Sequence, residues 1–312
     1  MKKTLATLIT TCFLSTLLFG QQKVQKTNSQ INEVNTNERF LKRKVAISRF
    51  SNETQYAKGL FYTKANDPIG KQAYDILATK LTSSGKFILL ERGDLDKVMD
   101  EYKITGDSNK FPKVGADYII LGSVTEFGRK DVGQTGLISR SKTQTVQAGV
   151  SLRLVDVSTG QVIYSEEGKG EATAIAKTTM GLGATADYDQ TLSDKAISAA
   201  ISKLVENIIR NCSDRPWKSF ILAYDENGIL ISGGKSQGLK VGDTFLVFEK
   251  GKSIKNPQTG MVIELPGKVV GKIKIDAFIG ETVETELSIV TFVDGTINKD
   301  KLENYFIRED KK

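Results

Sequence analysis

The charged pair Glu91-Arg92 is the first place in this sequence where side chains could do chemistry. It directly follows the apolar run "FILL" at 87–90, which predicts a short strand buried on both faces. The carboxyl end of such a strand is a favoured position for a site in an α/β sheet. The alternative is structural, with the pair capping or bridging neighbouring elements, and this is the interpretation we adopt.

The chain contains no histidine. Serine and cysteine nucleophile systems that use histidine as the base are therefore excluded, as are HExxH zinc sites. Two glycine-rich stretches fail as phosphate loops, because "GGKS" at 233–236 lacks the first glycine of a Walker motif and "GLGATA" at 181–186 is followed by "DYD". The sequence predicts no catalytic residue, no metal site and no cofactor, and we expect the protein not to be an enzyme.

The charge balance is mildly basic, with 44 Lys and Arg against 37 Asp and Glu. These charges are scattered, whereas a nucleic-acid surface needs a basic stripe interleaved with aromatic residues, so no nucleic-acid partner is predicted. With 39% hydrophobic and 26% charged residues, the 312-residue chain has a globular composition and room for two modest domains.

Residues 1–20 predict a signal peptide, because Lys2 and Lys3 precede an apolar run too short for a comfortable membrane helix. We therefore expect an exported protein. Cys12 lies in this segment, and whether it is a lipidation site is left open, since Thr11 stands where Gly, Ala or Ser is expected before a modified cysteine. Cys212 then remains alone in the mature chain, so no intrachain disulfide can form. Residues 21–42 are polar and aperiodic, as in a tether.

Residues 43–215 predict an α/β (α+β) domain, a sheet with packed helices. Asp67-Pro68 gives the start of a helix that Gly85 ends. The second helix has the apolar positions Leu95, Val98, Met99 and Tyr102, and a third is expected over 192–211.

Two long segments of this domain are rich in glycine, serine and threonine and have no helix signals, the first at 128–157 and the second after the "VSTGQ" turn. Small or apolar residues dominate the even positions from 172 to 188, a period-two pattern typical of strands with one face toward lipid and one toward a lumen. The candidate lipid-facing residues are Ala172, Ala174, Ala176, Met180 and Leu182. The alternative left open is a pair of amphipathic hairpins packed on a soluble sheet.

The sequence pattern changes in residues 216–312, where short predicted strands are separated by "ENG", "SGG", "QGLKVGD" and "LPGK". Tight turns at this spacing predict a small all-β, barrel-like domain.

Four blocks in the first domain carry a resemblance: "KVAISRFSNET", "GKFILLERGDLDKVMDEYKI", "GADYIILGSVTEFG" and "VSLRLVDVSTGQVI". In this order they resemble the CsgG family of curli secretion channels, over about residues 43–211. The resemblance implies that Glu91-Arg92 belongs to the fold and that subunits form a homo-oligomeric ring in the outer membrane. It also implies that each subunit donates two β-hairpins, here about 127–152 and 162–190, to a shared barrel. By the same resemblance the loop 53–66 narrows the pore, with Phe61, Tyr62 and Asn66 the nearest candidates.

The C-terminal stretch "GLKVGDTFLVFEKGKSIKNPQTG" resembles the terminal domain of the flagellar assembly protein FlgT, which implies docking to an envelope machine.

Two functions fit these features. The first is a subunit of a ring-shaped outer-membrane secretion channel or transport and assembly component, with an unfolded secreted polypeptide or an envelope protein as partner. The second is a soluble periplasmic scaffold or activator that binds envelope machinery without forming a pore. The alternation at 172–188 favours the first, whereas short arms without aromatic girdles favour the second. The expected location is the outer membrane, facing the periplasm, or the periplasm itself.

Overall fold

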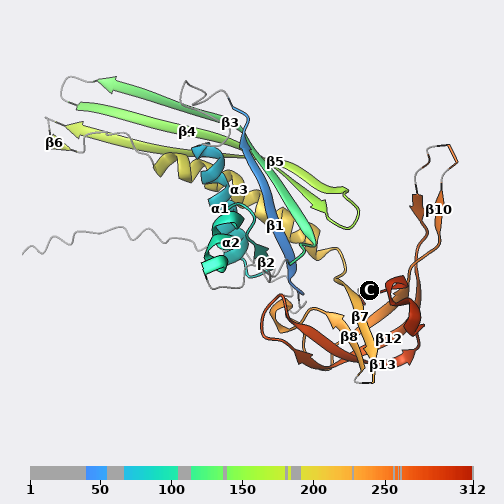
Figure 1. The fold of residues 1–312 in the computed structure, drawn as a ribbon. Helices are drawn as coiled ribbons and strands as arrows, with labels where there is room; N and C mark the ends of the chain where they lie inside the picture. The colour runs from blue at the N-terminus through green and yellow to red at the C-terminus, as the bar shows by residue number, and fades with distance from the viewer. Residues whose placement is uncertain are drawn as a thin grey trace, which may run out of the picture. The chain divides into compact units, whose positions relative to one another are not determined.

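The computed structural model describes residues 40–54, 67–104, 114–135, 139–179, 182–183, 191–226, 228–255, 257–258, 260 and 262–310. These residues fall in one compact unit, Phe40–Lys312, which contains two separate hydrophobic cores. One core lies between a mixed sheet and its helices, and the other fills a small barrel (Figure 1).

The mixed sheet has the strand order β2-β1-β3-β4-β5-β6. Its first three strands are parallel, and β3 to β6 are antiparallel. Because parallel neighbours cannot be joined by a tight turn, helices connect β1 to β2 and β2 to β3. The bounds are β1 (Arg43–Asn52), α1 (Pro68–Ser83), β2 (Phe87–Leu90), α2 (Leu95–Ile104), β3 (Tyr118–Thr135), β4 (Ser139–Asp156), β5 (Val162–Thr179), β6 (Leu182–Gly183) and α3 (Thr191–Ser213). This α/β arrangement confirms the predicted sheet with packed helices.

Local signals set the ends of α1. The Asp67 side chain accepts a hydrogen bond from the Gly70 amide, and Pro68 occupies the first turn, where its missing N–H costs nothing. Beyond the helix, Gly85 has a φ of 65°, a left-handed conformation that glycine adopts without strain. Both predicted ends are confirmed.

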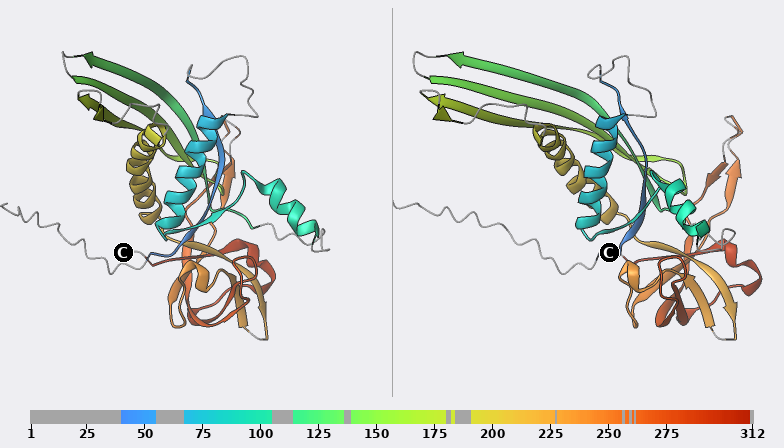
Figure 2. Two further views of the ribbon diagram at one scale, coloured as in Figure 1. Left: turned by 90° about the vertical axis from the view of Figure 1, so that its left-hand side faces the viewer. Right: turned by 60° about the vertical axis from the view of Figure 1, so that its left-hand side comes forward.

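Helices α1 and α3 lie side by side over one face of the sheet (Figure 2). Every third or fourth residue of α3 is buried there, which confirms the predicted helix. Gly168 and Gly170 on β5 allow this close packing, since a Cβ at Gly170 would lie 2.1 Å from the Ala196 carbonyl oxygen. Among the helices of the described segments, none is long and apolar enough to span a membrane.

Two elements differ from the sequence predictions. β2 is an edge strand in which only Phe87 is buried, although its apolar run predicts burial on both faces. α2 forms where predicted, but none of its residues is buried. In both cases the apolar pattern shows where the element is, whereas its neighbours depend on the order of the strands.

The strands β3, β4 and β5 form a long three-stranded arm. Each has 18 residues, and both the β3–β4 and the β4–β5 pairings run over almost the whole length of the strands. β5 therefore extends the first hairpin as a third strand. Figure 1 shows the arm reaching beyond the helices. Residues 184–190, the end of the second predicted hairpin, lie outside the described residues.

The barrel is closed in the order β12-β13-β8-β7-β14-β9, which confirms the barrel-like domain. A two-stranded sheet of β10 and β11 lies apart from it. The bounds are β7 (Lys218–Asp225), β8 (Gly228–Ser232), η1 (Lys235–Gln237), β9 (Thr244–Glu249), β10 (Ser253–Lys255), β11 (Val262–Glu264), β12 (Lys268–Ile279), β13 (Leu287–Gly295), η2 (Lys299–Asn304) and β14 (Tyr305–Arg308).

One residue of the barrel core comes from the other end of the sequence. Leu41, which the sequence analysis assigned to the tether, is 4% exposed and packs in the same cluster as Trp217 and Ile307. The last tether residues are thus part of the folded protein.

Candidate functional site

The Glu91-Arg92 pair joins β2 to α2, and its contacts are with neighbouring fold elements. Glu91 Oε1 accepts a hydrogen bond from the Tyr74 hydroxyl at 2.9 Å and from the Asp94 amide at 2.9 Å. Arg92 Nη2 donates to the Val114 carbonyl oxygen at 2.6 Å. The pair therefore links α1, the start of α2 and the segment before β3.

The protonation states agree with a structural role. Burial on its own would raise the pKa of Glu91, but the Asp94 amide and the Tyr74 hydroxyl outweigh it, and the pKa is lowered. Burial, with the Glu91 carboxylate as acceptor, raises the pKa of Tyr74 to about 12. At neutral pH, Glu91 is an anion and Tyr74 a neutral donor, so neither is poised to exchange a proton.

A hollow of about 440 Å³ lies beside this junction and is lined in part by Asp67 and Asp94. The Asp67 carboxylate is already engaged, because it accepts from the amides of Gly70 at 3.0 Å and Asn52 at 2.8 Å. Asp94 forms an exposed ion pair with Lys97. Within the described segments, no group of three or more His, Cys, Asp or Glu side chains could hold a metal ion.

The arm residues proposed to face lipid can be placed in part. Ala172 and Ala174 are half-buried and pack against the core of the sheet domain, and Ala176 is also half-buried. Met180 lies outside the described residues, and only the backbone of Leu182, in β6, is described. Packing of Ala172 and Ala174 on the protein's own core thus accounts for the alternation of small and polar residues as far as residue 174.

The alanine face of the arm also carries charge. Ala176 pairs with Lys142, and Ala174 pairs with Gln144, which in turn pairs with Asp131. Directly paired residues point to the same face, and a Lys142–Asp131 salt bridge of 3.1 Å joins the two charges there. A membrane assignment for this face would therefore put a lysine and an aspartate toward the lipid beside the alanines.

The opposite face of the arm is polar as well. Thr145 and Thr173 share a hydrogen bond of 3.3 Å, and Gln147 donates to Glu171 at 2.8 Å. Further along the same face, Lys169 forms a salt bridge with Glu126 at 2.8 Å. Neither face of the described arm is an apolar band.

The residues proposed for a pore constriction cannot be placed. Phe61, Tyr62 and Asn66 lie outside the described residues, which stop at Thr54 and resume at Asp67. Their role in a pore stays a prediction.

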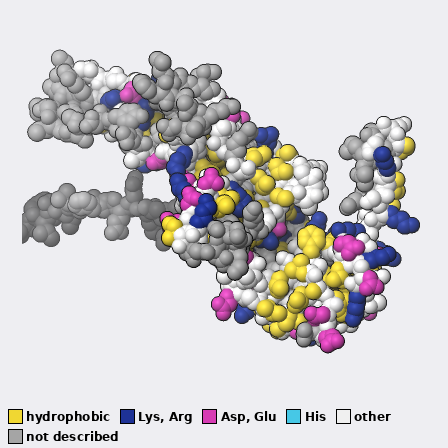
Figure 3. Space-filling view, viewed as in Figure 1, with side chains coloured by type: hydrophobic (Ala, Val, Ile, Leu, Met, Phe, Trp, Pro, Cys, Tyr) yellow, Lys and Arg dark blue, Asp and Glu magenta, His cyan; other side chains and the backbone are white. Residues whose placement is uncertain are grey.

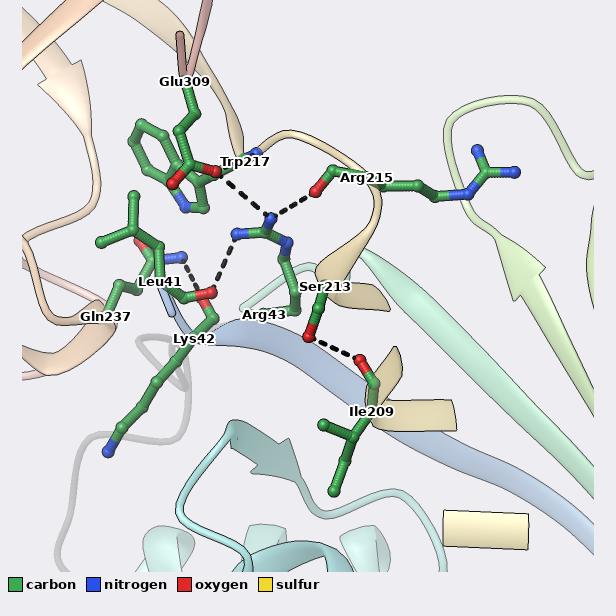
Figure 4. Close-up of polar contacts among 9 residues, drawn as sticks. All are labelled: Leu41, Lys42, Arg43, Ile209, Ser213, Arg215, Trp217, Gln237 and Glu309. Carbon is green, nitrogen blue, oxygen red and sulfur yellow. Dashed lines mark hydrogen bonds and ion pairs between the residues drawn. The ribbon is translucent and has the colours of Figure 1, made fainter. Parts of the chain in front are cut away.

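The two cores meet at a buried arginine that the sequence analysis did not single out. Arg43 is 3% exposed, and its guanidinium donates to the Leu41 carbonyl oxygen at 2.9 Å and the Arg215 carbonyl oxygen at 2.7 Å. Figure 4 shows these bonds and the approach to Glu309. Burial lowers the pKa of Arg43, with nearby groups including Tyr118, Glu309 and Asp117 acting against it.

A family model described as "Curli production assembly/transport component CsgG" matches residues 26–230, more than half of the 312-residue chain. The chain belongs to the CsgG family. A Neisseria meningitidis serogroup B protein, provisionally named as a lipoprotein, is 34% identical to this CsgG-family chain over 200 residues, which are 63% of this chain and 85% of the relative.

Two solved structures are more distant. The PelC dodecamer from Paraburkholderia phytofirmans is 19% identical, with 53% of this chain and 86% of PelC covered and a TM-score of 0.27. The lipoprotein GNA1162 from Neisseria meningitidis is 13% identical, with 55% of this chain and 99% of GNA1162 covered and a TM-score of 0.26. TM-scores this low carry no argument about fold or assembly.

Most of the barrel lies beyond the family match, which ends in β8. The likeness of this domain to FlgT stays a prediction. Its strand β7 contains "SFILA", which is apolar on both alternating faces.

Proposed function

We propose that this CsgG-family protein is a non-catalytic assembly or transport component of the cell envelope, and that it works as a homo-oligomer whose arm stays in water. The family description names an assembly and transport component, and the similar Neisseria protein is named as a lipoprotein. The signal-like N-terminus supports export. The engaged carboxylates at the Glu91 junction support a role without catalysis.

The observation that carries the proposal is the pair of open strand edges on the arm. β1 pairs with β3 only as far as Val124, so residues 125–135 have one edge without a strand neighbour among the described residues. β5 pairs with β6 only at Thr178 and Thr179, which leaves the rest of its outer edge without a described strand neighbour. Long open edges are surfaces onto which other strands add.

Another copy of the chain could occupy such an edge, and so could an extended segment of an envelope protein or secreted polypeptide. Edge pairing supplies backbone hydrogen bonds that are largely independent of sequence. This mode suits a component that assembles with itself and handles unfolded partners.

The polar arm supports the scaffold or assembly form of this function over a membrane-inserted channel. Each lysine or arginine held toward hydrocarbon near the bilayer centre costs about 2–4 kcal/mol. Lys142 stands on the alanine face and Lys169 on the opposite face, so each orientation would turn one lysine toward lipid. The channel remains the competing function, favoured by the alternation in β5, with Phe61, Tyr62 and Asn66 as its constriction.

Fractionation of cells that make the Cys12→Ser protein tests the proposal, since this variant cannot be lipidated at Cys12. We expect the protein in the envelope fraction or periplasm and expect it to leave membranes in an alkaline carbonate wash. A channel would require detergent for release even without a lipid anchor. Retention in the cytoplasm, or release by detergent alone, would contradict the proposal.

A further inference from the structure

A hollow of about 520 Å³, here called the interdomain hollow, lies where the sheet domain meets the barrel. Its walls come from the start of β3, the turn after β4, the segment that leads from α3 into β7, and the strands β7 and β14. Arg43 forms part of one wall. Clefts of this size between two structural units are preferred positions for ligands.

Two cations lie side by side in the barrel wall of this hollow. Cα pairing places Lys218 of β7 directly opposite Arg308 of β14. Their strand neighbours Ser219 and Ile307 are buried, so the two cations are on the outer face of the barrel. Like charges in directly opposite positions repel each other. A bound anion would offset this repulsion, so the pair favours a negatively charged ligand.

An aromatic ring holds the Arg308 guanidinium in place. The guanidinium carbon lies 4.1 Å from the centroid of the Phe248 ring, and Phe248 beneath it is only 6% exposed. A guanidinium stacked in this way keeps its N–H donors at its edge, where a planar carboxylate can accept from them.

Arg215 is the third cation in the wall. Its carbonyl oxygen accepts from Arg43, whereas its side chain extends away from that bond (Figure 4). In the described part of the chain, no salt bridge joins Arg215, Lys218 or Arg308 to an acidic group. All three cations are therefore available to an anion from outside the chain.

Two aspartates in the opposite wall limit the charge of that anion. They are Asp117, which accepts from the Lys44 amide at 2.8 Å, and Asp156. Glu309, 3.9 Å from Arg43, offsets that arginine, and the two aspartates offset two of the three remaining cations. The surplus is one positive charge. It matches a single carboxylate, whereas a phosphate group carries about −1.5 to −2 at pH 7.

Exposed apolar side chains lie beside the cations. Phe220, two positions after Lys218 on β7, is 52% exposed, and Val157 in the turn after β4 is 47% exposed. On the face of the barrel that Figure 3 shows, hydrophobic side chains gather, and Lys and Arg side chains lie along its border. A ligand with an apolar group next to its carboxylate would bury this surface.

We propose that the interdomain hollow binds a polypeptide segment in which a carboxylate stands beside an aromatic or large aliphatic side chain. The carboxylate contacts Lys218, Arg308 and Arg215. The apolar side chain packs on Phe220 and Val157. The choice of a polypeptide rests on the proposed function, in which the partner is an envelope protein or a secreted polypeptide. The hollow gives such a partner a contact separate from the open edges of the arm, so two weak contacts can act together.

Binding of short peptides to the Cys12→Ser protein tests the inference. The probe is acetyl-Ser-Phe-Glu-Phe-Ser-amide, and the comparison peptide has Gln in place of Glu. Titration calorimetry measures binding, and the fluorescence of Trp217, the one tryptophan of the chain, reports on the hollow that it lines. We expect saturable binding of the Glu peptide and at least about fivefold weaker binding of the Gln peptide. A third peptide, acetyl-Ser-Phe-Phe-Ser with a free C-terminal carboxylate, shows whether the carboxylate comes from a side chain or from a chain terminus.

Substitutions in the wall locate the binding. Lys218→Gln and Arg215→Gln should each weaken binding of the Glu peptide at least about fivefold, because each removes one of the cations. Both residues are exposed, so the fold should tolerate these changes. Lys240→Gln is the matched control, since Lys240 is an exposed lysine of the same domain outside the hollow, and it should leave binding unchanged.

Three results would overturn the inference: no binding up to about 1 mM peptide, equal binding of the Glu and Gln peptides, or equal effects of Lys218→Gln and Lys240→Gln. Binding to phosphatidylglycerol vesicles without binding to any peptide would overturn it too, because the cations would then serve a membrane surface. Sizing of the same protein without peptide separates the two proposals. An oligomer that binds no peptide refutes the inference alone, whereas a monomer that binds the peptide refutes the proposed assembly alone.

Discussion

The guanidinium Nη2 of Arg43, the first residue of β1, lies 3.9 Å from the Oε2 atom of Glu309, which directly follows β14. The Glu309 carboxylate also accepts from the Trp217 amide at 3.2 Å, and its own amide donates to the Trp217 carbonyl oxygen at 2.9 Å. One buried charge therefore ties the start of the sheet domain to both ends of the barrel.

Arg43→Met should lower the free energy of unfolding by about 1–3 kcal/mol, because it leaves the buried carbonyl oxygen of Leu41 and the part-buried carbonyl oxygen of Arg215 without their donor. Chemical denaturation provides the measurement. Lys42→Met is the matched control, since the Lys42 side chain points away from this cluster (Figure 4), and it should change stability by no more than about 0.5 kcal/mol. Equal effects of the two variants would contradict the role assigned to Arg43.

Leu41→Ala should destabilise the barrel by about 2–5 kcal/mol, because it opens a cavity in that core. Trp217 is the one tryptophan of the chain, and its ring centroid lies 5.2 Å from that of Phe245, so its fluorescence reports on this core. The fragment 216–312, predicted from the sequence to fold alone, lacks Leu41 and should unfold at lower denaturant concentration than the barrel in the full chain. Coincident transitions of fragment and full chain would show that Leu41 contributes nothing.

Arg92→Met should cost about 1–3 kcal/mol of stability through the lost bond to the Val114 carbonyl oxygen. A variant of Arg92 that keeps full stability but loses function would refute the structural assignment.

Tyr74→Phe should raise the pKa of Glu91 toward its usual value, since it removes one of the donors that lower it. A depressed carboxyl pKa stabilises the fold above the unfolded pKa, and this contribution is lost as the pH falls through the folded pKa. Carboxyl chemical shifts across a pH titration measure the change.

Cys212 gives a pH dependence on the alkaline side. Burial raises its pKa to about 12, well above the usual value of 9.0 for a thiol. Because the unfolded thiol ionises first, stability is fully present below pH 9 and falls as the pH rises toward 12, by about 1.4 kcal/mol between pH 8 and pH 10. Cys212→Ala should lack this decrease. Parallel stability curves for the two proteins over this range would contradict the buried, protonated thiol.

Elements with strong local signals were predictable. Asp67 and Pro68 mark the start of α1 because a cap and a fixed φ act within one turn. The turns of the barrel were visible for a similar reason, since Gly238 and Gly242 both have a φ of 91°, where glycine is unstrained.

What surrounds an element was harder to predict. Period two in β5 shows that Ala174 and Ala176 share a face, but only the pairing with β4 shows that Lys142 is on that face too. Likewise the stripe on α2 predicts a helix without saying that its apolar residues are at most half-buried. Arg43 and Leu41 stand at the end of a polar stretch, and their burial depends on a strand more than 250 residues away.

The most direct test of the account is the mass of the Cys12→Ser protein purified from the periplasm and sized in buffer without detergent. The account predicts a soluble species whose mass is an integer multiple of the protomer mass. A protomer-sized species at every concentration, or an oligomer that exists only in detergent, would contradict the central claim that this CsgG-family protein assembles with its arm in water.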